Sequence, residues 1–216
     1  MSDWNTHLYC ANRVNQVLQY QGKDLDLFLF GNILPDVNMG WIITPDVRLE
    51  QADTHFDAMG QEYFWAPLRF YEEYREAIDS REPLHMGYLF HLWLDVSFMT
   101  YFVSRVPMSL MVSDYHKVRE LKWKDAGLFI DDYKCPLSPE NIDDIVSQAK
   151  SIREVNISKQ DLQKVVEYTG AGSKEYEGDE YQLFTEKELA DFYDRICSDF
   201  MAWIPTPRRI SPLSPG

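Results

Sequence analysis

The sequence of 216 residues has few cysteines and a shortage of basic side chains. Its three cysteines, Cys10, Cys135 and Cys197, are odd in number and far apart in the chain, which argues against a disulfide framework and for reduced thiols. Only 21 Lys and Arg stand against 35 Asp and Glu, so the formal net charge is −14. Such a chain repels polyphosphate, and we do not expect a polynucleotide partner.

Long apolar runs are also missing. The N-terminus has neither a basic region nor an uninterrupted apolar stretch, so a cleaved secretion signal is not expected. The most apolar segment, residues 86–103, is shorter than the roughly 20 residues that span a bilayer, and it carries His91 and Asp95 near its middle. We therefore expect a cytoplasmic protein without a transmembrane segment, in which this stretch is a buried central helix.

Aromatic side chains are plentiful, with 12 Phe, 13 Tyr and 6 Trp, and they require a substantial core. Helical spacing of apolar residues recurs and strand signals are weak, which predicts one all-α domain, a helical bundle over residues 1–204. Residues 205–216 contain four prolines and are expected to form a flexible tail.

The expected helices follow from apolar periodicity and from capping signals. They span residues 7–21, 61–78, 82–104, 113–131, 138–150, 158–168 and 185–203, the last opened by a Thr185–Glu188 capping box. Residues 24–30 are expected to form a helical turn, although their alternation also allows a strand. Residues 32–54 read as a long loop that is too apolar for disorder, and long loops in compact domains are often functional.

One pair of polar side chains interrupts the apolar face of the helix expected over residues 82–104. His91 and Asp95 are four residues apart and therefore lie one above the other on that face. A buried carboxylate is costly unless it is paired, so the two side chains either hydrogen-bond to each other or share a cation.

Three other residues carry the same ambiguity. His7 begins the apolar face of the first helix, where it is either a satisfied core histidine or a ligand. Asp36 follows Pro35 in an apolar loop and is either a turn residue or a ligand, and His55 is either a cap or a ligand. Together with His91 and Asp95 they provide imidazole and carboxylate donors, the types that zinc and other divalent metals prefer.

Four segments, THLYCANRV, FLFGNILPDV, THF and MGYLFHLWLD, occur in this order within residues 5–100. This ordered set resembles the zinc-dependent phospholipase C family, in particular its short bacterial members. The resemblance implies an all-α fold shared with nucleases of the P1 type and a zinc cluster that hydrolyses phosphodiester bonds. Its implied metal ligands are His7, Asp36, His55, His91 and Asp95, and Asp36 is also the implied catalytic base or water-orienting group.

The resemblance weakens after Asp95. The family has further ligands there, a His and a His-x-x-x-Glu, and this chain offers only His116 with Glu120. We include His116 among the candidate ligands, although its helix is charged. One or two metal ions, zinc or else manganese or another divalent metal, are expected rather than three.

The resulting hypothesis is a metal-dependent hydrolase of phosphoester or phosphodiester bonds, acting on a small phosphoester or a phospholipid-like substrate through a metal-activated water. The alternative is a non-catalytic metal-binding helical scaffold that acts through protein partners. A metal phosphohydrolase of the His-Asp type would need an adjacent His-Asp dipeptide, and the sequence has none.

Overall fold

The computed structural model describes residues 4–56, 65–107, 109, 113–130, 133, 137–171 and 180–204, and it is helical without a strand in these ranges. This confirms the all-α prediction. The helices are α1 (Trp4–Leu18), α2 (Lys23–Gly31), α3 (Leu34–Val37), α4 (Gln51–Thr54), α5 (Ala66–Glu73), α6 (Arg75–Asp79), α7 (Pro83–Arg105), α9 (Tyr115–Phe129), α10 (Ile142–Ala149), α11 (Lys159–Ala171) and α12 (Glu186–Trp203), with a 3-10 turn at Pro139–Asn141.

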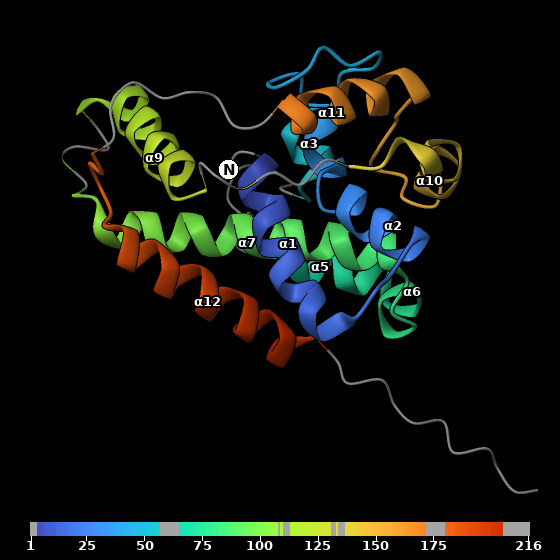
Figure 1. Cartoon of the computed structure of the whole chain (residues 1–216), viewed down its shortest axis with the longest axis horizontal. Coiled ribbons are helices and arrows are strands. Elements are labelled where there is room, and N and C mark those ends of the chain that lie inside the picture. The colour runs from blue at the N-terminus through green and yellow to red at the C-terminus, as the bar shows by residue number, and fades with distance from the viewer. Residues whose placement is uncertain are drawn as a thin grey trace, which may run out of the picture.

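Helix α7 runs through the middle of the molecule, with α1 crossing it and α12 lying along it (Figure 1). Pro83 lies in its first turn, where a missing N–H costs nothing. From Leu84 to Leu92 every residue is buried, as expected for a helix surrounded by others. In the described part of the chain, no helix combines the length and apolarity that a bilayer crossing requires.

Helices α2 and α7 approach each other backbone to backbone at two glycines. A Cβ on Gly31 would lie 2.2 Å from the carbonyl oxygen of Leu84, and a Cβ on Gly87 would lie 2.1 Å from that of Phe28. Only glycine fits such a contact. The Asn32 side chain adds a hydrogen bond from Nδ2 to the Gly87 carbonyl at 3.1 Å. The end of α2 is therefore held against the first half of α7.

Several local predictions can be compared with the structure. The Thr185 capping box is confirmed, with the Glu188 N–H donating to the Thr185 hydroxyl at 3.2 Å and Glu188 accepting from the Thr185 N–H at 2.9 Å. Helix α9 is capped by Asp114, which accepts from the Lys117 N–H, rather than by Ser113. A carboxylate at the N-terminus of a helix also interacts favourably with the helix dipole.

Two predicted segments are divided in the structure. The expected loop 32–54 contains the short helices α3 and α4, and Pro35 supplies the fixed φ that starts α3. In the expected helix 61–78, the described part breaks at Tyr74 into α5 and α6, while residues 61–64 lie outside the described residues. Residues 205–216, predicted as a tail, lie outside them as well.

Candidate metal centre

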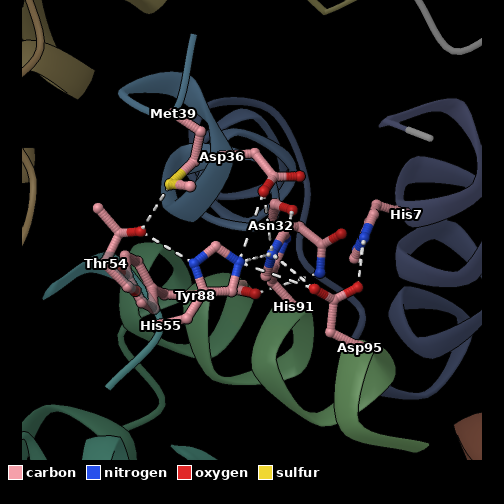
Figure 2. Close-up of polar contacts among 10 residues, drawn as sticks. His7, Asn32, Asp36, Met39, Thr54, His55, Tyr88, His91 and Asp95 are labelled. Atoms are coloured by element: carbon pink, nitrogen blue, oxygen red, sulfur yellow. Dashed lines mark hydrogen bonds and ion pairs between the residues drawn. The ribbon is translucent and has the colours of Figure 1, made fainter. Parts of the chain in front are cut away.

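Five polar side chains point toward one another in the centre of the fold (Figure 2). Helix α1 provides His7, α3 provides Asp36, the end of α4 provides His55, and α7 provides His91 and Asp95. Each is between 0% and 3% exposed. The convergence of these five predicted residues, from four separate segments, makes this the strongest candidate site in the described part of the chain.

The hydrogen bond of His91 determines which of its ring nitrogens faces the site. Its Nδ1 lies 2.9 Å from the backbone oxygen of Asn32, which can only accept, so Nδ1 carries the proton. The Nε2 atom then presents a lone pair to the other four side chains. A ring oriented through its outer nitrogen in this way is typical of metal-binding histidines.

His55 is oriented by a similar arrangement. The Thr54 hydroxyl donates to the Met39 sulfur at 3.4 Å, and its oxygen lies 2.9 Å from His55 Nδ1. When the hydroxyl proton is directed to Met39, the Thr54 oxygen accepts from Nδ1–H of His55. The Tyr88 hydroxyl donates to the Thr54 backbone oxygen and braces this segment. His55 Nε2 therefore also presents a lone pair.

The two Nε2 atoms of His55 and His91 are 3.2 Å apart, and with these tautomers neither can donate to the other. Two facing lone pairs in a buried site repel unless a proton or a cation lies between them. Asp36 Oδ1 and Asp95 Oδ2 lie 3.5 to 3.9 Å from both nitrogens. In a tetrahedral zinc site with bonds of about 2.0–2.2 Å, ligand atoms are about 3.3–3.6 Å apart. The distances of 3.2 to 3.9 Å are near that spacing, and Asp36, His55 and His91 form one buried group of candidate ligands.

A second subsite adjoins this tetrad. Asp95 Oδ1 lies 3.3 Å from His7 Nε2, while Asp95 Oδ2 faces His55 and His91. The His7 and His91 rings are stacked, with centroids 4.1 Å apart. His7, His91 and Asp95 thus form a second buried group of possible ligands beside Asp36, His55 and His91. Asp95 therefore belongs to the His7 group through Oδ1, while its Oδ2 lies 3.7 and 3.8 Å from the Nε2 atoms of His55 and His91.

The protonation states favour ligation near neutral pH. Burial, together with the neighbouring His7, lowers the pKa of His91 to about 3, so its imidazole is neutral. Burial opposes ionisation of Asp36, but His91 and His55 outweigh it and lower the pKa of Asp36. The pKa of Asp95 also lies well below its usual range. Burial raises that pKa, but the effects that lower it are larger, among them the hydrogen bond with His7 and the electrostatic influence of His91 and His7. Neutral imidazoles and ionised carboxylates are the metal-binding forms.

The other predicted ligand lies elsewhere. His116 and Glu120 are exposed on α9, and neither belongs to the two buried groups. The apolar face of α9 packs inward, which leaves this pair on the solvent side. His85 is buried near Ser151 and Glu82, with His85 Nε2 3.3 Å from the Ser151 hydroxyl, and lies outside the site as expected.

Some residues around the site were not predicted from the sequence. Lys122 on α9 is 3% exposed, and its Nζ lies 5.3 and 5.2 Å from the Phe98 and Phe102 ring centroids. Burial lowers the pKa of Lys122, while the nearby Asp95 opposes this. The sequence contains a signal for the burial of Lys122, because Val118 and Lys122 are four residues apart and therefore lie on one helix face. By contrast, no spacing rule links Met39 to Thr54.

A pocket of about 470 Å³ opens beside the site. Asp53 and Phe56, which flank the Thr54–His55 segment, line it together with Leu49, Ala52, Arg69, Arg153 and Glu154. Phe56 has a φ of +56°, an uncommon value for a residue with a side chain, and it turns the chain directly after His55. The pocket is thus separated from the buried donors by the Thr54–Phe56 segment.

Comparisons with family models, with curated proteins and with solved structures find no match.

Proposed function

We propose that this protein is a metal-dependent hydrolase of phosphoester or phosphodiester bonds, of the phospholipase C and P1-type nuclease kind that its sequence motifs resemble. The observation that carries the proposal is the facing pair of imidazole Nε2 atoms, 3.2 Å apart, with a carboxylate oxygen of Asp36 and of Asp95 beside both. This donor set fits a divalent cation in composition, spacing and protonation.

We assign the first metal to Asp36, His55, His91 and Asp95, and a second to His7 and Asp95 with His91 nearby. Zinc suits these nitrogen and oxygen donors best, and manganese is the next candidate. The candidate ligands in the described part of the chain are imidazoles and carboxylates, a set that catalytic zinc sites use, whereas structural zinc sites are dominated by cysteine.

Divalent cations held by these residues would supply a water of lowered pKa and positive charge for the phosphoryl oxygens. The chain's own residues then have distinct roles. Asp36 is the catalytic residue that orients the attacking water and accepts its proton. The carbonyl of Asn32 and the hydroxyl of Thr54 hold the His91 and His55 rings in their metal-binding orientation.

The substrate we propose is a small phosphoester or a phospholipid-like headgroup that binds in the pocket beside His55 and reaches the donors when the intervening Thr54–Phe56 segment moves aside. The volume of the pocket, about 470 Å³, is within the range for small-molecule ligands. Arg69 and Arg153 line the pocket together with two acidic residues, and Arg153 pairs with Glu154 at 2.7 Å, so the pocket offers guanidinium groups without a net positive charge. A polynucleotide would meet the protein's net charge of −14.

A second candidate function is a non-catalytic scaffold that holds one structural metal ion. The burial of all five donors, at most 3% exposed, favours it, because a catalytic metal needs a position open to water and substrate. The two candidates agree on metal binding and differ in turnover.

The deciding experiment measures metal content and hydrolysis of bis-p-nitrophenyl phosphate after loading with zinc or manganese. The hydrolase proposal expects at least one ion per chain and turnover, both lost in His55→Ala. His85→Ala is the matched control, since it also removes a buried histidine but lies outside the donor groups. Bound metal without turnover of any phosphoester would favour the scaffold, and protein that binds no metal would overturn both.

A further inference from the structure

Two cysteines that are 187 residues apart in sequence meet between α1 and α12. Cys10 is 0% exposed and Cys197 is 7% exposed, and both are free thiols. The Cys197 thiol donates to the Cys10 backbone oxygen at 3.7 Å, which places its sulfur against the main chain that carries Cys10. Their wide separation in the sequence predicts reduced thiols without a disulfide framework, and it gives no sign that two of them lie close together in the fold.

The surroundings make the two thiols unequal. The hydrogen bond from Cys10 and the positive charge of Arg13 lower the pKa of Cys197 against the effect of burial. Burial and the neighbouring Cys197 raise the pKa of Cys10. Cys197 is therefore the more acidic thiol of the pair, and it is also the one with some solvent exposure.

An ion pair next to the thiols holds the same two helices together. Arg13, one turn after Cys10 on α1, pairs with Asp194, one turn before Cys197 on α12. Arg13 Nη1 also donates to the Tyr9 hydroxyl at 3.0 Å. Both cysteines thus lie on helices that pack against each other, with the Cys197 sulfur next to the Cys10 backbone, and disulfide closure requires such proximity.

We propose that Cys10 and Cys197 form a redox-modification site, at which a hydroperoxide oxidises Cys197 and a disulfide then closes between α1 and α12. The site uses none of the five metal donors, so it stands independently of the proposed hydrolase.

The chemistry is a two-electron oxidation by the hydroperoxide. The Cys197 thiolate attacks the outer peroxide oxygen, the O–O bond breaks, and the alkoxide leaves and takes the proton that the thiol gave up, which leaves a sulfenic acid. The Cys10 thiol then attacks the sulfenic sulfur, an S–S bond forms, and hydroxide leaves as water with the Cys10 proton. Two thiols and one hydroperoxide yield a disulfide, an alcohol and water.

The test treats the reduced full chain with hydrogen peroxide in a Cys135→Ser background, so that only Cys10 and Cys197 remain. Because two protons are lost, the intact mass should fall by about 2 Da, and peptide mapping should find one Cys10–Cys197 cross-link that dithiothreitol reverses. A chain that gains oxygen atoms without a cross-link, or that keeps both thiols free, would overturn the proposal.

Single substitutions separate the two roles. Cys10→Ser should stop at the sulfenic acid, seen as a dimedone adduct at Cys197, whereas Cys197→Ser should leave Cys10 unreacted. Arg13→Gln keeps both thiols and should slow oxidation several-fold near neutral pH with the same cross-linked product, because the charge that favours the thiolate is gone. A dimedone adduct on Cys10 in place of Cys197, or an unchanged rate in Arg13→Gln, would contradict the assignment of Cys197 as the reacting thiol.

Discussion

Two helices of this protein carry a histidine followed four residues later by an acidic residue, and the two pairs have opposite solvent exposure. On α7 the pair is His91 and Asp95, both buried among other donors. On α9 it is His116 and Glu120, both exposed. Identical spacing therefore places two side chains on one face of a helix, and only the neighbouring elements determine whether that face becomes a site.

The two helices differ in how they are packed. Helix α7 is enclosed along its first half, with α1, α2 and α3 supplying His7, Asn32 and Asp36 around it. Helix α9 buries a different stripe, which includes Val118, Lys122, Asp125 and Ala126. On that stripe the Asp125 carboxylate accepts the backbone N–H groups of residues 182–184, so the polar groups of α9 that point inward stabilise a loop.

The largest difference between the two histidine–acid pairs is expected in how they affect the unfolding free energy at low pH. His91 has a folded-state pKa of about 3 against an ordinary 6.5, so the unfolded chain binds its proton first as the pH falls. The unfolding free energy of the metal-free protein should be greatest above pH 6.5 and should decrease toward pH 3, by up to about 1.4 kcal/mol per pH unit. Denaturant titrations at several pH values measure this. His91→Gln should flatten the slope and His116→Gln should retain it, and the reverse would contradict the comparison.

Next in size is the effect of neutralising one carboxylate on each helix. Asp95→Asn should weaken zinc binding by about 100-fold or more, because it removes a charged donor shared by both subsites. Glu120→Gln is the matched change on α9 and should leave the affinity unchanged. Competition with a chromogenic chelator gives both values, and equal losses would mean that the α9 pair also binds metal.

A third test concerns the contact between α2 and α7. Gly87→Ala should lower the unfolding free energy by about 1–3 kcal/mol, since the added methyl meets the Phe28 carbonyl. Gly170→Ala on α11 is the control, because nothing lies within 4 Å of its Cβ, and it should be neutral or stabilising by about 0.5–1 kcal/mol. Chemical denaturation measures both. If the two variants were equally stable, the backbone contact would not hold α7 in place.

A smaller effect is expected from the support of His55. Thr54→Val keeps the shape of the side chain but removes the oxygen that accepts from His55 Nδ1–H. Metal affinity should fall about 10-fold, as is typical when an outer hydrogen-bond partner of a ligand is lost. Thr100→Val on the exposed face of α7, where the hydroxyl bonds only to its own helix, serves as the control. An equal loss in both variants would indicate a general loss of folding.

The smallest effect is expected at His116. His116→Ala on the exposed face of α9 should change the unfolding free energy by no more than about 0.5 kcal/mol. Metal content and phosphoester turnover should match those of the unmodified protein. A loss of metal in this variant would mean that α9 contributes a ligand to the site.

The sequence allowed part of the site to be predicted because several of its donors interrupt an apolar pattern. His91 and Asp95 stand on the face of a helix that is otherwise apolar, and His7 does the same on α1. The capping signal of α12 is equally local, since Thr185 and Glu188 contact each other within one turn. Such features depend on neighbours in sequence, and periodicity detects them.

What could not be predicted depends on contacts between distant segments. The tautomer of His91 is determined by a carbonyl 59 residues away, and that of His55 depends on Met39 through Thr54. The meeting of Cys10 and Cys197 likewise follows from the packing of the first helix against the last. His116 was included because of its spacing alone, and spacing carries no information about which face of α9 is covered.

The glycine contact between α2 and α7 has a consequence for the precision of the site. At this crossing main chain meets main chain, so the gap between the helices is defined by atoms that have no alternative rotamers. The Asn32 carbonyl that orients His91 extends directly from this junction. Repacking of the surrounding core could therefore change many side chains and still leave the His91 imidazole in the same orientation. The main chain at this crossing, rather than the side chains around it, determines the ligand geometry.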